Sequence, residues 1–521
     1  MKLYEQLAET IRTQIEDGIM LEGEKIPSVR RTSQQYQLSI STVIRAYLLL
    51  ESRGLIESRP QSGYFVRMRQ APDGAGLSAP APQGAPHAVE PAAGPDMAPA
   101  ALVLSNMRSI NSADRIPLGS PYPDPSLFPS ARISQLAHGF YKRRDRQELM
   151  GSLPPGNAEL IRQVARRHLE TGLAVNAAEI VITEGATEAI HLCLQAISRP
   201  GDGIAVEAPT YYALLHAIER IGMRAVPVAT DPQNGIDLPS LNAVIESGQV
   251  AGAIVMPNFQ NPMGFEMPEE RKRALVDLMA SHDLPLIEND VYGELHYAEQ
   301  RPRPLKAFDR NGLVLYCSSF SKSLTPEHRI GWTLPGRYRQ AVERLKFLNT
   351  VTMPSHPQRA IAEYLQNEGY DFHLRRLRKT LSQQERIMRS AVLRFFPPGT
   401  QCSDPNGGYL LWVTLPPGVQ GMDLHVRAQA AGISVAPGNM FSTAESFGNC
   451  IRLNYSFAWN REIEQAVRLL GEITHELAAH AANLANAGNA ANADLARPAA
   501  KAAAAAPGAA QAPASGLTKA S

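Results

Sequence analysis

The sequence predicts an α/β protein whose mostly parallel sheet lies between helices, preceded by a small module of three helices and a hairpin. Between residues 113 and 478, short apolar strands alternate with helical patterns, which is typical of parallel α/β sheets. Residues 1–69 are charged, patterned and nearly free of proline. Residues 70–112 are rich in alanine, proline and glycine, which predicts a flexible linker. We expect the Ala-rich residues 479–521 to form a disordered tail, although alanine also favours extension of the last helix until Pro498 stops it.

Bulk properties limit the class of protein. At 521 residues the chain is too long for one ordinary core. Its 51 lysines and arginines nearly balance 50 aspartates and glutamates, so any argument for nucleic-acid binding has to be local. The four cysteines lie far apart, which fits a reducing cytosol and argues against a disulfide framework or a metal site. The N-terminus lacks an apolar signal core and no run of about 18 apolar residues occurs, so we expect a cytoplasmic protein without a membrane span.

The N-terminal module begins with three helical segments. Apolar residues spaced by four form one face of a helix over residues 3–17. Ser28 is expected to cap a second helix, and Ser39 a third helix that reaches Gly54. Two short strands joined by a turn follow, ending at residue 66. Three helices followed by a hairpin form a winged helix-turn-helix.

Charge is distributed unevenly along this module. Residues 1–27 hold three basic and six acidic residues, whereas residues 28–69 hold seven arginines and two acidic residues. The positive charge therefore coincides with the second helix, the third helix and the hairpin, where the phosphates of a DNA duplex would lie. The alternative is a solvated helical cap, because charge runs are often simply exposed surface.

Four segments of the module closely resemble GntR-type regulators. Family members usually carry a basic residue at the position of Ile40, so isoleucine here favours contact with a thymine methyl group, or reliance on neighbouring polar residues, over guanine readout. The resemblance implies double-stranded DNA as a partner. The segments are Pro27-Ser28-Val29-Arg30, Ser39-Ile40-Ser41-Thr42-Val43, Leu50-Glu51-Ser52-Arg53-Gly54-Leu55-Ile56 and Arg59-Pro60-Gln61-Ser62-Gly63. The DNA-binding residues that it implies are Ser28, Arg30, Ser39, Ser41, Thr42, Arg45, Arg59, Gln61 and Gly63.

The most informative segment of the large domain is Ser319-Phe320-Ser321-Lys322-Ser323-Leu324, with Arg329 shortly after it. It follows the apolar run over residues 313–317, which predicts a buried parallel strand. A lysine flanked by hydroxyl groups and an arginine suits an aldehyde cofactor that carries a phosphate. Lys322 would form the imine, while Ser319, Ser321 and Arg329 would hold the phosphate.

Other segments end predicted strands at the same edge of the sheet, where ligands collect in open α/β folds. Gly185-Ala186-Thr187 follows one strand and opens a helix, so its backbone N–H groups suit a phosphate. Tyr211 follows the next strand and is suited to stack on a pyridine ring; a buried core tyrosine is the alternative. Asn261, in Asn-Pro-Met-Gly, is expected to donate to the phenolic oxygen of the cofactor, unless the segment is only a turn.

Two residues that follow another predicted strand, and one arginine near the C-terminal end of the domain, complete the candidate site. Asp290 is expected to pair with the pyridine nitrogen and keep it protonated, and Tyr292 to bond the phenolate. Arg452 lies in an apolar strand, where an unpaired guanidinium is costly to bury. A ligand carboxylate held bidentately is one partner for it, and a structural salt bridge is the other.

Together these segments resemble fold-type I aminotransferases over nearly all of residues 113–478, in the family's own order. With the N-terminal module attached, the whole chain resembles the MocR subfamily of GntR regulators. The resemblance implies the fold of a fold-type I PLP-dependent transferase, with a smaller C-terminal α+β subdomain. It also implies pyridoxal 5'-phosphate as cofactor and a head-to-tail homodimer.

These expectations define a function and its alternatives. The sequence predicts a transcriptional regulator that senses an amine, an amino acid or the cofactor itself through aldimine chemistry at Lys322, with Asp290 and Tyr292 as the other catalytic residues. A working aminotransferase that carries a DNA-binding module is the alternative, because fold alone does not decide. A cofactor-free scaffold is the third hypothesis.

Overall fold

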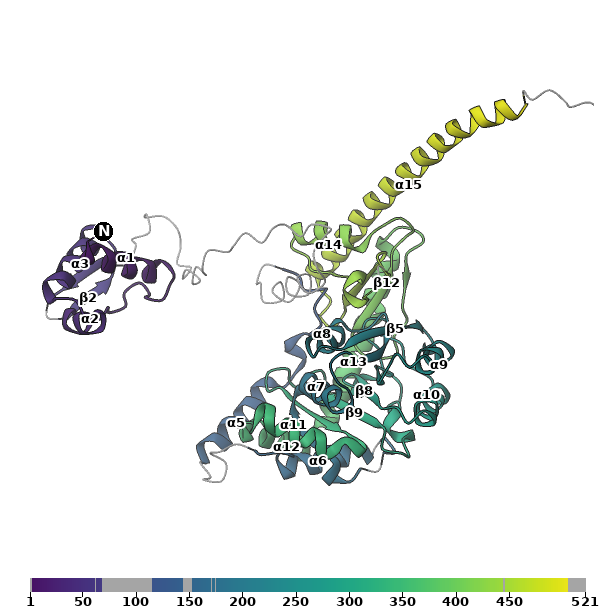
Figure 1. Cartoon of the computed structure of the whole chain (residues 1–521), viewed down its shortest axis with the longest axis horizontal. Coiled ribbons are helices and arrows are strands. Elements are labelled where there is room, and N and C mark those ends of the chain that lie inside the picture. Colours follow the sequence, from purple (N-terminus) through teal and green to yellow (C-terminus); the bar gives the residue numbers. More distant parts are fainter. Residues whose placement is uncertain are drawn as a thin grey trace, which may run out of the picture. The chain divides into compact units, whose positions relative to one another are not determined.

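The computed structural model describes residues 2–60, 62–67, 115–143, 152–169, 171–173, 175–443 and 446–504, with side chains described up to residue 484. The predicted linker, residues 70–112, lies outside these ranges. The chain divides into two compact units, Met1–Ala92 and Ala93–Ser521 (Figure 1).

The small unit is a winged helix-turn-helix, as predicted. Ser28 Oγ accepts a hydrogen bond from the Arg31 N–H, and Ser39 Oγ accepts one from the Thr42 N–H, so both expected N-caps are confirmed. Tyr47 lies in the core of the unit, where its hydroxyl bonds Thr32 and the Pro27 carbonyl. The elements are α1 (Leu3–Glu16), α2 (Val29–Tyr36), α3 (Ile40–Ser52), β1 (Ile56–Arg59) and β2 (Gly63–Val66), the last two antiparallel.

The large unit is built on an eight-stranded sheet in the order β3-β10-β9-β8-β7-β4-β5-β6. Neighbouring strands from β9 to β5 are parallel, β10 is antiparallel to both of its neighbours, and β6 is antiparallel to β5. The sheet is therefore mostly parallel, as predicted. The strands are β3 (Val181–Glu184), β4 (Gly203–Ala208), β5 (Arg224–Asp231), β6 (Gly235–Ile236), β7 (Gly252–Val255), β8 (Leu286–Asn289), β9 (Val314–Ser319) and β10 (Ile330–Leu334).

Apolar side chains cover both faces of this sheet. Along β4, Ile204 and Val206 belong to one buried cluster, whereas Ala205 belongs to another, because successive side chains of a strand point to opposite faces. Helix α7 packs across β3, β8, β9 and β10. The helices are α5 (Ser130–Arg143), α6 (Ala158–Leu169), α7 (Gly185–Ile197), α8 (Tyr212–Arg220), α9 (Leu238–Glu246), α10 (Glu269–Ser281), α11 (Arg339–Thr350), α12 (Ser355–Asn367) and α13 (Tyr370–Phe395).

A second, antiparallel sheet forms a smaller C-terminal α+β subdomain, as the resemblance implied. Its order is β11-β12-β14-β13, and its strands are β11 (Gln401–Cys402), β12 (Leu410–Thr414), β13 (Ala436–Pro437) and β14 (Cys450–Asn454). Helices α14 (Gly421–Ala430) and α15 (Arg461–Ala504) accompany it. Short 3-10 turns connect the elements: η1 (Pro125–Leu127), η3 (Ala177–Glu179), η4 (Gly293–Leu295), η5 (Leu305–Phe308), η6 (Gly336–Tyr338) and η7 (Gly438–Phe441).

Helix α15, yellow in Figure 1, is longer than the sequence indicated. It is helical beyond residue 479, where we expected a disordered tail, and it does not stop before Pro498. The high helix propensity of its many alanines favours this extension. Within the described residues, no helix is long and apolar enough to cross a membrane.

Candidate functional site

Lys322 lies three residues beyond the end of β9, at the edge of the sheet where the sequence predicted it. Its Nζ donates a 2.9 Å hydrogen bond to the Pro121 carbonyl and lies 4.4 Å from the centre of the Tyr122 ring. Burial, together with the charges of Arg329 and Arg452, lowers the pKa of Lys322 to about 7. A large fraction of this amine is therefore uncharged, and nucleophilic, at neutral pH.

Asp290 follows β8 and is almost completely buried. Its carboxylate accepts three hydrogen bonds, from Asn258 Nδ2 at 2.8 Å, Arg301 Nη2 at 2.8 Å and the Tyr316 hydroxyl at 2.9 Å. The Ser318 hydroxyl donates to the Asp290 carbonyl at 2.9 Å, which ties this residue to β9. Asp290 is thus a rigidly held carboxylate beside the strand that leads to the lysine.

Three segments meet in a cradle next to Lys322. Arg329 Nη1 donates to Ser321 Oγ at 3.3 Å. Gly185 begins α7 at a φ of +71°, and a Cβ there would lie 2.8 Å from Arg329 Nη2, so only glycine lets the guanidinium approach the helix N-terminus this closely. A helix N-terminus, a hydroxyl and a guanidinium form the donor set that binds a phosphate.

The remaining predicted residues lie on the same strand ends. Ser319 ends β9 and is buried, while Ala186 and Thr187 occupy the first turn of α7, with Thr187 exposed. Tyr211 immediately precedes α8, and its ring lies 4.7 Å from that of Tyr212. Electrostatic neighbours of Tyr211 include Tyr292 and Arg452, so it faces the same region of the site.

Arg452 on β14 is completely buried. Its guanidinium donates to the Gly119 carbonyl at 2.7 Å and to Asn261 Oδ1 at 3.0 Å, and it lies 5.1 Å from the Phe441 ring. Among the described residues no carboxylate pairs with it, and its Nε has no hydrogen-bond partner. The structural salt bridge that the sequence left open is therefore absent from the described part of the chain.

Burial raises the pKa of Tyr292, which also hydrogen-bonds Tyr409 and Asn261. The two tyrosine rings meet edge to face with their centres 5.4 Å apart. Asn261 thus links Tyr292 to Arg452 through hydrogen bonds to both.

Sequence reasoning missed the residues that support this site. Asn258 links Asp290 to buried Lys272, whose Nζ donates to Asn258 Oδ1 at 2.6 Å. Arg301 and Tyr316 approach Asp290 from a different loop and strand, and no local pattern marks them. The segment that supplies Pro121 was also missed, although its alternating prolines and a tyrosine were a visible signal.

In the small unit, the candidate DNA-binding residues lie mostly on the surface. Arg30 and Arg45 are exposed and have no ion-pair partner among the described residues, whereas Arg59 pairs with Glu57 and stacks 4.4 Å from the Phe65 ring. Ile40 is 51% exposed at the start of α3. Ser28, Ser39, Ser41 and Gly63 are exposed and Thr42 is half-buried; Gln61 lies outside the described residues.

Comparisons with known proteins agree with this architecture. Residues 3–66 match the family described as bacterial regulatory proteins of the gntR family, and residues 124–470 match aminotransferase class I and II. The chain is 39% identical over 480 residues to the uncharacterized HTH-type transcriptional regulator YdcR of Escherichia coli, covering 91% of this chain and 100% of that protein. It is 35% identical over 486 residues to YjiR, an uncharacterized HTH-type regulator of the same organism, covering 91% and 99%.

Solved structures match the large unit. The α-aminoadipate aminotransferase LysN of Thermus thermophilus, complexed with N-(5'-phosphopyridoxyl)-L-leucine, is 27% identical with a TM-score of 0.67, covering 73% of this chain and 97% of that one. A kynurenine aminotransferase of Pyrococcus horikoshii, complexed with PMP, is 28% identical with a TM-score of 0.66, covering 72% and 94%. The chain therefore belongs to the GntR-type transcriptional regulators that carry an aminotransferase class I and II domain, the MocR subfamily expected from its sequence.

Proposed function

We propose that this protein is a DNA-binding transcriptional regulator whose aminotransferase-like domain senses a small amine or amino acid. The cofactor is pyridoxal 5'-phosphate, held at Lys322. This cofactor supplies an aldehyde that condenses with amines and a pyridinium ring that withdraws electrons. Because its N-terminal module binds DNA, we place the protein in the cytoplasm.

The donor set of the site fits this cofactor. The cradle formed by the start of α7, Ser321 and Arg329 suits the phosphate. Buried Asp290, fixed by three donors, suits a protonated pyridine nitrogen. Asn261 and Tyr292 suit the phenolic oxygen, and Lys322, with a pKa of about 7, suits the aldehyde.

Arg452 is proposed to take the carboxylate of the ligand. The guanidinium now donates to two neutral oxygens, Gly119 O and Asn261 Oδ1, which a carboxylate would outcompete because charge-assisted bonds are stronger. Lys322 would hold the cofactor through its uncharged Nζ, and the same amine would be the base that takes and returns the α-proton of a bound ligand.

The observation that carries this proposal is the pairing of a lysine of lowered pKa with the phosphate cradle beside it. The test is borohydride reduction of the cofactor-supplemented protein followed by peptide mass spectrometry. A reduced adduct on Lys322, absent in Lys322→Ala, is expected. An adduct on another lysine, or none, contradicts the assignment.

A working aminotransferase is the second candidate, and one observation favours it. Lys322, Asp290 and Tyr292 are the residues proposed for catalysis, and a lysine with a pKa of about 7 is a competent base at neutral pH. Keto-acid formation over many turnovers would establish an enzyme. A single stoichiometric event per site would support a sensor alone.

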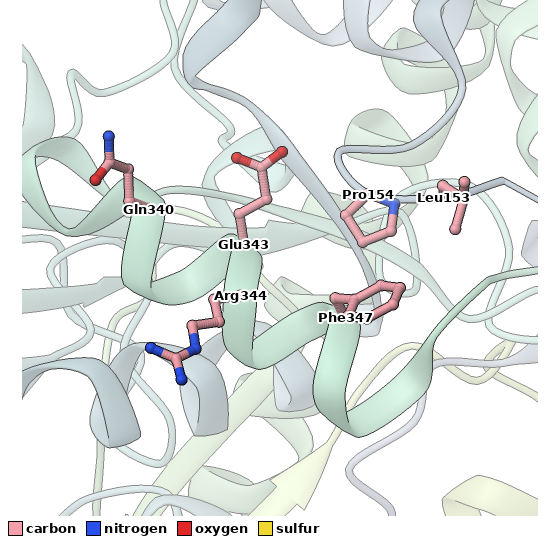
Figure 2. Close-up of a pocket in the computed structure, with 6 residues that line it drawn as sticks. All are labelled: Leu153, Pro154, Gln340, Glu343, Arg344 and Phe347. Atoms are coloured by element: carbon pink, nitrogen blue, oxygen red, sulfur yellow. The ribbon is translucent and has the colours of Figure 1, made fainter.

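We propose further that two copies form the head-to-tail homodimer that the sequence resemblance implied. Figure 2 shows Phe347 of α11 facing Pro154, in a pocket of about 460 Å³. Leu153, Phe347 and Leu348 are 58%, 49% and 62% exposed, and neighbouring exposed apolar side chains of this size mark an interaction surface. Light scattering should give a dimer for the natural chain and a monomer for Phe347→Glu; a Phe347→Glu dimer would place the interface elsewhere.

The DNA partner is proposed to be an operator with paired half-sites, because a dimer carries two winged helices. Arg30 and Arg45 are its expected phosphate contacts. A ligand-dependent change in the retardation of operator DNA on a native gel would support sensing. If amines and amino acids change the visible spectrum of the protein but leave the retardation of operator DNA unchanged, the enzyme is favoured.

A further inference from the structure

Three large apolar side chains lie exposed along one side of α3, the second helix of the helix-turn-helix. Ile40, Ile44 and Leu48 are 51%, 40% and 52% exposed. They are spaced by four residues, so they lie one above another on the surface of the helix. Val43 and Tyr47 of the same helix are buried in the core of the unit, and none of the three exposed residues packs against that described core. Ile40, Ile44 and Leu48 therefore form a separate apolar ridge, and adjoining exposed apolar side chains mark an interaction surface.

The charge around the apolar ridge is positive. Residues 28–50, which cover α2 and most of α3, contain Arg30, Arg31 and Arg45 but no aspartate or glutamate. All three arginines are exposed, and none has an ion-pair partner among the described residues. A second copy of the same surface would bring like charges together, whereas a DNA duplex supplies phosphates along both sides of its major groove. Charge complementarity therefore favours DNA as the occupant of the ridge.

Hydroxyl groups at the start of α3 already hydrogen-bond one another. Ser39 Oγ accepts a hydrogen bond from the Thr42 N–H at 3.2 Å, and it lies 2.9 Å from Ser41 Oγ and 2.7 Å from Thr42 Oγ1. Ile40 and Ile44, in the first and second turns, offer no hydrogen-bonding group. In a helix-turn-helix the N-terminal residues of this helix reach the base edges in the major groove. We therefore expect apolar contact with bases at this end of α3.

Thymine is the base that suits such side chains. Its C5-methyl group lies in the major groove, where guanine presents the N7 and O6 acceptors and cytosine an N4 donor. Burying those polar groups against isoleucine without a partner is costly. We propose that Ile40 and Ile44 both read thymine methyl groups, so that the operator carries A·T pairs where they dock. This assignment rests on the proposed function, because it requires the small unit to bind a specific operator.

The proposal also fixes the spacing of the two thymines. Ile40 and Ile44 are one helical turn, about 6 Å, apart along the helix axis. One base-pair step is about 3.4 Å along a DNA strand. The two thymines should therefore lie one or two base-pair steps apart.

The test starts from duplexes that the full chain selects from a random DNA pool. Each thymine of a selected duplex is replaced in turn by deoxyuridine, which lacks only the C5-methyl group. Fluorescence anisotropy at constant salt then measures the dissociation constant. We expect replacement of either of two thymines to weaken binding about fourfold, which is the equivalent of one buried CH₂ group.

Variants assign each thymine to a side chain. Ile40→Ala should remove the deoxyuridine effect at one of the two thymines, and Ile44→Ala at the other, because a contact that is already lost cannot be lost twice. Ile40→Arg should change the preferred base at its position to guanine, whose N7 and O6 accept from a guanidinium. Leu48→Ala is the matched control: Leu48 is equally exposed, but it lies two turns beyond Ile40. It should retain both deoxyuridine effects and change affinity less than about twofold.

Several results would overturn the thymine assignment while leaving the proposed function intact. One is specific binding that no deoxyuridine replacement weakens. Another is a deoxyuridine effect that persists in both Ile40→Ala and Ile44→Ala, because the methyl group would then touch a different residue. Unchanged DNA affinity in both variants would mean that the ridge contacts protein instead. Selection that yields no preferred duplex would refute the proposed operator and the thymine assignment together.

Discussion

The reactivity of Lys322 should depend on pH as that of an unusually acidic amine. With a pKa of about 7, half of its amine is uncharged at pH 7 and roughly a tenth at pH 6. An ordinary lysine, with a pKa of about 10.4, is uncharged only to about four parts in 10⁴ at pH 7. The pKa of Lys322 is lowered because burial and two nearby cations disfavour the charged form of its amine.

Competitive acetylation of the cofactor-free full chain, read by peptide mass spectrometry, measures this directly. Exposed Lys379 of α13 serves as the reference in the same digest. Labelling of Lys322 should rise about tenfold from pH 6 to pH 8 and then level off. In Arg452→Gln the plateau should move to higher pH, because one of the cations that lowers the pKa has been removed.

Two results would refute this reasoning. Labelling of Lys322 that still rises tenfold per pH unit above pH 9 would mean that the amine has an ordinary pKa. An unchanged profile in Arg452→Gln would mean that burial and Arg329 alone account for the shift.

Three further outcomes follow from single contacts. Gly185→Ala should weaken pyridoxal phosphate binding at least roughly tenfold by displacing Arg329, whereas Gly201→Ala, also at positive φ but with open space around it, should leave the dissociation constant unchanged; fluorescence titration compares the two. Arg45→Ala should weaken DNA binding and lower the slope of log affinity against log salt by about one, and an unchanged slope would exclude a phosphate contact. Ser39→Ala should cost about 1 kcal/mol of the module's unfolding free energy in urea, since it removes the cap of α3; a loss below about 0.3 kcal/mol would show that the cap contributes little.

Residues marked by a local sequence pattern were the ones that sequence reasoning found. The caps at Ser28 and Ser39 are local, because each side chain accepts a hydrogen bond from the backbone N–H three residues later. The sequence around each serine is therefore enough to predict them. The strand ends that carry Lys322 and Asp290 were equally accessible, because apolar runs mark buried parallel strands.

The supporting residues that only the tertiary fold brings to the site were not found. Strand β10 was not predicted, yet Gly331 within it lies between α7 and β9, where a Cβ would lie 2.5 Å from the Gly185 carbonyl carbon. Arg301 contacts Asp290 only because a loop returns to the sheet edge. Lys272 is buried, which local patterning argues against, because lysine is the residue expected on the exposed face of a helix.

The bond from Arg452 to the Gly119 carbonyl joins the proposed ligand site to the first residues of the large domain. Gly119 lies seven residues after the predicted end of the linker, and a bound carboxylate competes for the donor that fixes it. Thermodynamic reciprocity then works in both directions: whatever factor an amino acid imposes on operator affinity through this segment, the operator imposes on amino-acid affinity. The amino-acid concentration needed for half-saturation would accordingly differ between protein bound to its operator and protein free in solution.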